Sequence, residues 1–152
     1  MSARATIRMT DDEVTAYLSA PRTLNVATIG ADGAIHLVAM WYTMRDGCPV
    51  FTTYGKSQKV VDLRRDARLS ALVEDGADYG SLRGVELIGH GEIIEDPDQV
   101  LDLVREISAH YGARGSAQDA VKAATKRVGV RLVPDRVISW DHSKAGAVPA
   151  AR

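Results

Sequence analysis

Two Asp-Gly pairs, each lying between β-rich runs, constrain the fold of this chain more than any other sequence feature. They are Asp32-Gly33 and Asp46-Gly47. Asp-Gly readily adopts the positive backbone angles of two-residue hairpin turns, so each pair predicts a tight antiparallel connection. Parallel strands need long crossovers, so consecutive hairpins exclude alternating βαβ units. We therefore expect a mainly β fold, a small antiparallel barrel with peripheral helices.

The remaining elements are placed by capping signals and by apolar periodicity. A capping box from Thr10 to Glu13 begins the first helix, and Asp96-Pro97 begins a later one that ends before Gly112. Glycines within the longest strand predict bends or bulges, as at a barrel corner. The expected helices span 10–20, 58–65, 97–111 and 117–128. The expected strands span 23–29, 34–44, 49–54, 69–74, 82–95, 130–133 and 136–140.

Length and charge limit the classes of protein to consider. The 152 residues fit one domain, 1–152, with a core from about 10 to 142 and a flexible tail over 143–152. Nineteen basic and 20 acidic residues give a formal charge of −1, which argues against nucleic acid or an anionic membrane as partner. No apolar run reaches about 18 residues, and the single Cys48 makes no internal disulfide. We expect a soluble cytoplasmic protein.

A short basic segment, Gly55-Lys56-Ser57-Gln58-Lys59, joins a strand to a helix. The amides at a helix start point outward unpaired, and nearby lysine and serine side chains add to an anion site there. The Gly-Lys-Ser triplet is not a P-loop, because that motif needs a glycine where Val50 stands. Two interpretations remain open: a phosphate site, or a solvated basic turn with Ser57 as N-cap.

The run Val38-Ala39-Met40-Trp41-Tyr42 is almost continuously apolar. It fits a strand with one face on the core and the other on a subunit interface, or a strand that lies along a flat aromatic ligand. The four histidines lack metal-ligand spacing, so we expect no metal site. Tyr42, Tyr79 and His36 are possible proton donors, but no spacing selects among them, and we name no catalytic residue.

Taken together, these blocks resemble the flavin/deazaflavin oxidoreductase family, the split-barrel proteins related to pyridoxamine 5′-phosphate oxidase. The matching segments are residues 24–29, 33–42, 50–53, 56–70 and 82–91, within a resemblance that extends over about 10–142. The most specific part runs from Lys59 through Arg64-Arg65-Asp66-Ala67-Arg68. Ala67 stands where the family usually has proline. The resemblance implies an FMN-binding split β-barrel.

The resemblance also implies a set of cofactor-binding residues. Lys59 matches the family's phosphate-binding lysine, and Lys56 and Ser57 lie in the same loop. Thr52 stands where the family contacts the ribityl-phosphate part of the cofactor. The strand beside the tricyclic ring is matched by Val38, Ala39, Met40 and Trp41. The family is homodimeric, with two cofactor sites across the interface.

In function, the resemblance implies hydride transfer between a bound cofactor and a small organic molecule. The sequence is similar to the actinobacterial branch of the family, whose members use the deazaflavin coenzyme F420. This similarity implies a reductase that uses reduced F420 to reduce a conjugated organic substrate. The alternatives are an FMN-dependent oxidoreductase or oxidase, a non-enzymatic cofactor carrier and, outside the family, a heme-handling barrel. The carboxylate tail of F420 would suit a site with additional cations, and the sequence offers Arg64, Arg65, Arg68, Arg4 and Arg8. The alternative is that these arginines are ordinary surface charges balanced by Asp62 and Asp66.

Overall fold

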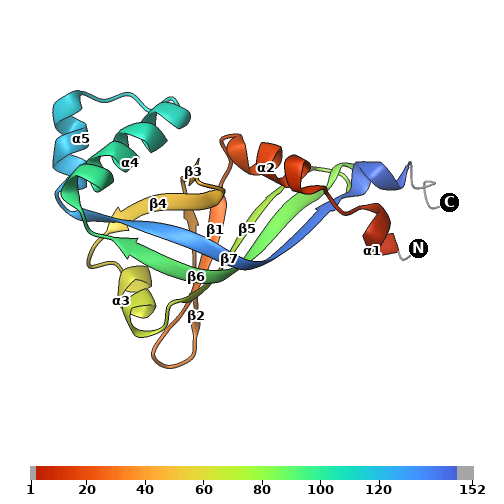
Figure 1. Ribbon diagram of the computed structural model, residues 1–152, viewed down its shortest axis with the longest axis horizontal. Helices are drawn as coiled ribbons and strands as arrows, with labels where there is room; N and C mark the ends of the chain where they lie inside the picture. Colours follow the sequence, from red (N-terminus) through yellow and green to blue (C-terminus); the bar gives the residue numbers. More distant parts are fainter. Residues whose placement is uncertain (1–2, 147–152) are drawn as a thin grey trace.

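One curled antiparallel sheet dominates the computed structural model, which describes residues 3–146 (Figure 1). Its strands are β1 (Leu24–Ile29), β2 (Ile35–Met40), β3 (Thr43–Arg45), β4 (Cys48–Tyr54), β5 (Arg68–Asp75), β6 (Arg83–Ile94) and β7 (Arg127–Asp141). They lie in the order β2-β1-β5-β6-β7-β4-β3, and all the neighbours are antiparallel. Strands β2 and β3 form separate edges, so the barrel is split. The expected fold class is confirmed.

The helices lie around the sheet. They are α1 (Ala3–Thr6), α2 (Asp11–Ser19), α3 (Gln58–Arg65), α4 (Pro97–His110) and α5 (Ala117–Ala124), with short 3₁₀ turns η1 (Tyr79–Ser81) and η2 (His142–Ala145). The pair α4 and α5 lies at one end of the sheet, near β4, whereas α1 lies at the other end (Figure 1). The expected capping box of α2 is present: Glu13 N–H donates to Thr10 Oγ1 at 3.2 Å, and Thr10 N–H donates to Glu13 Oε2 at 2.6 Å.

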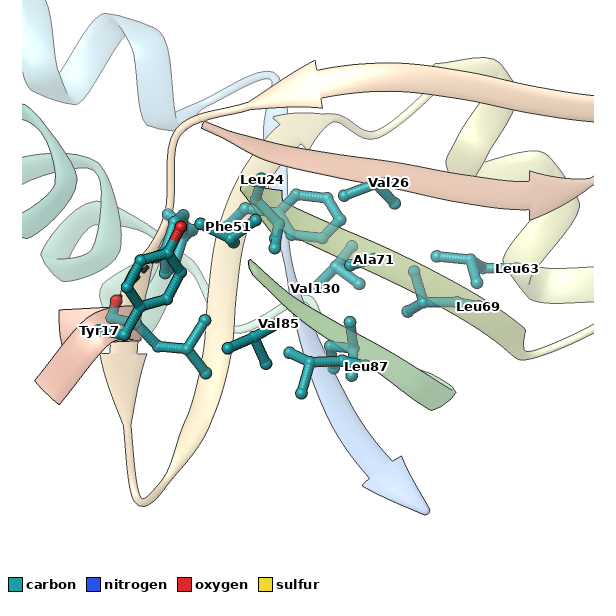
Figure 2. Packing of buried hydrophobic residues seen from close by; sticks show 14 of the residues in the cluster. Tyr17, Leu24, Val26, Phe51, Leu63, Leu69, Ala71, Val85, Leu87 and Val130 are labelled. Atoms are coloured by element: carbon teal, nitrogen blue, oxygen red, sulfur yellow. Dashed lines mark hydrogen bonds between the residues drawn. The ribbon is translucent and has the colours of Figure 1, made fainter. Parts of the chain in front are cut away.

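Alternate residues of each strand point into a single core (Figure 2). On β1, the side chains of Leu24, Val26 and Thr28 are fully buried and their neighbours are half-buried. Phe51 of β4 and Val130 of β7 meet them from the other half of the curled sheet (Figure 2). The alternating pattern therefore buries the side chains on the inner face of the sheet, while the side chains on the outer face of β2 are exposed.

The expected single strand over 34–44 is wrong. The chain leaves the sheet edge after Met40, and β3 begins only at Thr43, on the opposite edge of the sheet. Tyr42 explains the break, because its ring is fully buried and its hydroxyl donates to the carbonyl of Leu18 at 2.7 Å. A buried tyrosine hydroxyl requires a partner, and here the partner is a backbone carbonyl of α2.

The expected boundary of the last helix is also wrong. Helix α5 ends at Ala124, and β7 begins at Arg127 rather than at Val130. Val128 pairs with Thr53 of β4 and is buried, so packing within the sheet outweighs continuation of the helix. Gly129 is not a helix stop: a Cβ there would lie 2.8 Å from a methyl group of Leu103.

The two strands expected around Pro134-Asp135 are one continuous strand, β7, with a bulge. Ile88 pairs with Arg136 and Gly89 pairs with Pro134, which leaves one extra residue on β7. A Cβ on Gly89 would lie 2.0 Å from the carbonyl oxygen of Val133, so this close approach requires glycine. The bend predicted from the strand glycines is confirmed at this position.

The C-terminal end differs partly from the expected tail over 143–152. Residues 142–145 form η2, and Ser143 N–H donates to the Asp141 carboxylate at 3.0 Å. Residues 147–152 lie outside the described part of the chain. Among the helices of residues 3–146, none has the length and apolar character needed to cross a bilayer.

Candidate functional site

A cleft of about 460 Å³ lies between the chain segment that leaves β2, the first residues of β7, and the α4–α5 pair. Four of the sequence-predicted site residues line it: Ala39, Met40, Trp41 and Thr52. The other lining residues are Thr23, Val104, Ile107, Ser108, Ala123 and Arg127. We call this space the ring cleft, because its wall includes the Trp41 indole.

The Trp41 ring is held in place although 51% of the residue is exposed. Tyr111, which follows α4, stacks on it with centroids 4.7 Å apart and planes 6° from parallel. The Tyr111 hydroxyl donates to the carbonyl of Arg22 and accepts from the Tyr42 N–H at 3.3 Å. Burial raises the pKa of Tyr111, so its hydroxyl keeps its proton for this contact. This stack could not be foreseen from the sequence, because Tyr111 fitted the apolar face of a helix.

Val38 does not line the ring cleft. Its side chain, like that of Met40, is half-buried and packs against the core. Alternation along β2 therefore turns Ile35, Leu37 and Ala39 outward, and all three are exposed. We expected both faces of this strand to be covered. In residues 3–146 the core covers the face that carries Val38 and Met40, and the other face is exposed.

The basic segment before α3 places its two lysines differently. Lys59 is only 7% exposed, and its ammonium donates to Thr53 Oγ1 at 3.0 Å. Burial, and then the nearby positive charge of Arg127, lower the pKa of Lys59. Lys56 is exposed. Ser57 is the N-cap as predicted, but its hydroxyl makes no capping bond and lies 3.3 Å from Thr53 Oγ1.

Arg127 is a further cation at the ring cleft. It falls within the helix expected over 117–128, but it lies half-buried in β7, opposite Tyr54 of β4. Its guanidinium lies 4.7 Å from the centre of the Tyr54 ring, and Nη1 is 3.4 Å from the carbonyl oxygen of Thr52. The residue lines the ring cleft, and its charge acts on Lys59. Sequence reasoning missed it because the helix was extended too far.

The arginines considered for an F420 tail lie elsewhere or are already engaged. Arg64 pairs with Glu95 at 2.6 Å, Arg68 pairs with Asp66 at 2.6 Å, and Arg65 donates to the carbonyl of Ile29. The Arg68 hydrogen bonds lower the pKa of Asp66 to about 2. Arg4 and Arg8 line a different cleft, beside Trp140 at the C-terminal end of β7. In the described chain, these five cations do not extend the ring cleft.

None of the possible proton donors lines the ring cleft. The Tyr42 hydroxyl is committed to Leu18, and burial raises its pKa. Tyr79 is 63% exposed on η1 and packs edge-on against His142, while His36 lies on β2. Within residues 3–146, no group of three or more histidine, cysteine, aspartate or glutamate side chains is arranged to hold a metal ion.

Comparisons with known proteins agree with this architecture. The chain is similar over its whole length to a conserved hypothetical protein of Mycobacterium tuberculosis, Rv2991, with 41% identity, a TM-score of 0.90 and 97% of that chain covered. This relative fits the actinobacterial branch. The fold alone is shared with an F420 reductase (24% identity, TM-score 0.68, 80% of this chain and 93% of that one). It is also shared with a FAD-binding protein of Mesorhizobium loti (20% identity, TM-score 0.65, 86% and 93%).

A search of curated proteins finds no match. The family model described as pyridoxamine 5′-phosphate oxidase, however, matches residues 10–141, which include every strand of the sheet and the whole ring cleft. The chain therefore belongs to the pyridoxamine 5′-phosphate oxidase family.

Proposed function

We propose that the protein is an oxidoreductase that binds a phosphorylated flavin-type cofactor in the ring cleft and transfers a hydride from reduced F420 to a conjugated small organic substrate. One observation carries the proposal: the cleft lined by Trp41 also contains the cation Arg127, and a second, buried cation, Lys59, lies at the start of α3, which follows β4. Among residues 3–146, neither cation has a carboxylate partner within 4.0 Å. Such cations beside an aromatic wall suit a ligand with a planar ring and a phosphate.

The residues fit such a cofactor in two parts. Ala39, Met40 and Trp41 offer a flat wall to a tricyclic ring, and Thr52 lies between this wall and the lysine segment. The Lys59 ammonium and the Ser57 hydroxyl, which caps no helix amide, would bind the phosphate. When bound, the cofactor supplies the hydride chemistry, while the protein positions it and the α4–α5 pair limits access of water.

Exposed Lys56 favours F420 over FMN. It has no carboxylate partner in the described chain, and it lies next to the phosphate segment, where the carboxylate tail of F420 would begin. The shared fold with an F420 reductase is in keeping with this choice. FMN is the second candidate, because the engaged arginines suit a cofactor that ends at its phosphate. A carrier without turnover is the third, because none of the three candidate proton donors lines the cleft.

We also propose that the protein is a homodimer. The outer face of the sheet carries apolar side chains from β2, β1, β5 and β7, namely Ile35, Leu37, Ala27, Leu72, Ile138 and Trp140. Ile35 and Leu37 are 63% and 67% exposed, and a contiguous apolar face of this kind is typical of an interface. A second copy presenting the same face would cover it.

A titration of F420 and FMN, followed by cofactor fluorescence, tests the function. We expect both to bind, F420 more tightly and with a steeper salt dependence because of its extra carboxylates. Oxidation of reduced F420 by quinone or enone acceptors then separates an enzyme from a carrier. Binding of FMN without F420 would replace the cofactor assignment, and a protein that binds neither would refute the proposal.

A further inference from the structure

A second cleft, of about 570 Å³, lies beside α1 and η2, at the end of the sheet away from α4 and α5 (Figure 1). Residues 136–140 of β7 form one wall, and Arg4, Ile7 and Arg8 form another. The second wall is held against the sheet, because the Asp141 N–H donates to the carbonyl of Ile7 at 2.7 Å. We call this space the arginine cleft, and its volume is in the range typical of small-molecule sites.

The Trp140 indole gives the arginine cleft a flat aromatic surface whose position is fixed. Trp140 is half-buried, lines the cleft and pairs with Gly84 across the β6–β7 ladder. A Cβ on Gly84 would lie 2.2 Å from Cζ2 of the indole, so the ring lies directly against the glycine backbone. His142 also lines the cleft, and Tyr79 packs edge-on against it. An indole held in this way offers a ready surface for the ring of a ligand.

The cations of the arginine cleft have no acidic partners. Arg4, Arg8 and Arg136 line it together with a single carboxylate, that of Glu86. In the part of the chain that the structure describes, none of these three guanidinium groups lies within 4.0 Å of a carboxylate oxygen. Six arginines elsewhere do have such a partner, namely Arg22, Arg45, Arg64, Arg68, Arg83 and Arg131. The cleft is therefore electropositive, and each planar guanidinium can donate two parallel hydrogen bonds to a carboxylate or a phosphate.

We infer that the arginine cleft is a second binding site, which takes a flat aromatic anion. The ring of the ligand packs on Trp140, and its carboxylate or phosphate binds the three arginines. The inference does not depend on the proposed function, because the arginine cleft and the ring cleft share no lining residue. Ile138 and Trp140 also belong to the face proposed for the dimer, so the ligand would lie where that face meets residues 4–8.

Tryptophan fluorescence separates this site from the ring cleft, because the chain has two tryptophans, Trp41 and Trp140. Trp41→Phe leaves Trp140 as the reporter of the arginine cleft, and Trp140→Phe leaves Trp41 as the reporter of the ring cleft. The probes are 4-nitrobenzoate, whose nitroaromatic ring quenches tryptophan, and 4-nitrobenzamide, its neutral analogue. We expect 4-nitrobenzoate to quench Trp140 with an affinity at least about tenfold above that of 4-nitrobenzamide, and to lose affinity as salt is added.

Substitutions of the arginines in the Trp41→Phe protein test the role of the charges. Arg8→Gln and Arg136→Gln should each weaken 4-nitrobenzoate by about fivefold or more and leave 4-nitrobenzamide within about twofold. Arg105→Gln is the matched control and should change neither affinity, because Arg105 is an exposed arginine of α4 that lines neither cleft.

The inference is overturned by equal affinities for the acid and the amide, by unchanged affinity in both arginine variants, or by quenching of Trp41 instead of Trp140. Quenching of Trp140 only in a monomeric Leu37→Lys variant would show that a second copy covers the cleft, and it too would overturn the inference. Neither F420 nor FMN is present in these titrations, so failure of the proposed function would leave their result unchanged.

Discussion

Replacing Lys59 by methionine should stabilise the unliganded protein and weaken its binding of a phosphorylated cofactor. Methionine has nearly the length and flexibility of lysine without its charge. The site is close to the core, at 7% exposure, so the substituted thioether would be buried among existing contacts. A residue kept for folding alone would show the opposite sign of stability change.

The size of the effect follows from two opposing contributions. Desolvation of an unpaired ammonium costs several kcal/mol in real proteins, and the repulsion from Arg127 adds to it. Against this, the mutation loses the charge-assisted bond to Thr53, about 1.5–3 kcal/mol. Thr53 Oγ1 is not orphaned, because Ser57 Oγ lies 3.3 Å away. We expect a net gain of about 1–2 kcal/mol, or about 3–6 °C in melting temperature for a chain of this length.

Urea denaturation of the unliganded proteins gives the free energy of unfolding, and fluorescence titration gives the affinity for F420 and FMN. Lys56→Met is the matched control, because Lys56 lies in the same segment but is exposed. Its stability should stay within about 0.5 kcal/mol of wild type. Destabilisation of Lys59→Met by 1 kcal/mol or more, with cofactor affinity retained, would refute the view that this lysine is buried for a ligand.

Three further outcomes are expected. Lys59 has a lowered pKa in the folded protein and a pKa of about 10.4 in the unfolded chain. Between these two values the unfolded chain binds more protons than the folded protein, so the free energy of unfolding should rise with pH. Urea denaturation from pH 8 to 10 should show this slope in wild type and not in Lys59→Met. Leu37→Lys should convert the proposed dimer to a 16.4 kDa monomer in sedimentation at micromolar concentration, whereas Val121→Lys, at a side chain of α5 that is 45% exposed, should leave the dimer intact. A wild type that is already monomeric at this concentration would refute the proposed dimer. Gly89→Ala should lower the free energy of unfolding by about 2–3 kcal/mol, because the added Cβ would lie 2.0 Å from the carbonyl oxygen of Val133. Gly80→Ala, which has open space around it, should be neutral in the same urea denaturation assay. Equal effects of the two substitutions would contradict the close approach at the bulge.

The sequence predicted the fold where a signal was local. The capping box at Thr10 is in place, and both Asp-Gly pairs lie in hairpin connections. Asp46 and Gly47 both have positive φ, as a two-residue turn requires, whereas Asp32-Gly33 lies in a longer loop over 30–34 in which Gly33 alone has positive φ. The sequence failed where a distant contact decided the outcome. The break after Met40 depends on Tyr42 reaching a carbonyl on α2, and the end of α5 depends on Val128 pairing with β4. Neither partner is visible from periodicity.

The site divides in the same way. The lysine segment was recognisable, since a glycine, lysines and a helix start occur together in the sequence. Trp41 was identified from the resemblance, but its orientation was not, because its stacking partner Tyr111 follows α4, 70 positions further along the chain. Arg127 was hidden by its neighbours: beside Lys126 it resembles an ordinary helix-end charge, and only the pairing with Tyr54 places it at the cleft.

The two parts of the site are built on separate elements, and this separation has a consequence for specificity. The ring wall depends on β2, on the Trp41–Tyr111 stack and therefore on α4, whereas the anion site depends on α3, β4 and the start of β7. Thr52, which lines the ring cleft, directly precedes Thr53, the hydrogen-bond partner of Lys59. Changes at the wall should therefore alter which ring or substrate is accepted while phosphate affinity stays constant, and changes at Lys59 should do the reverse.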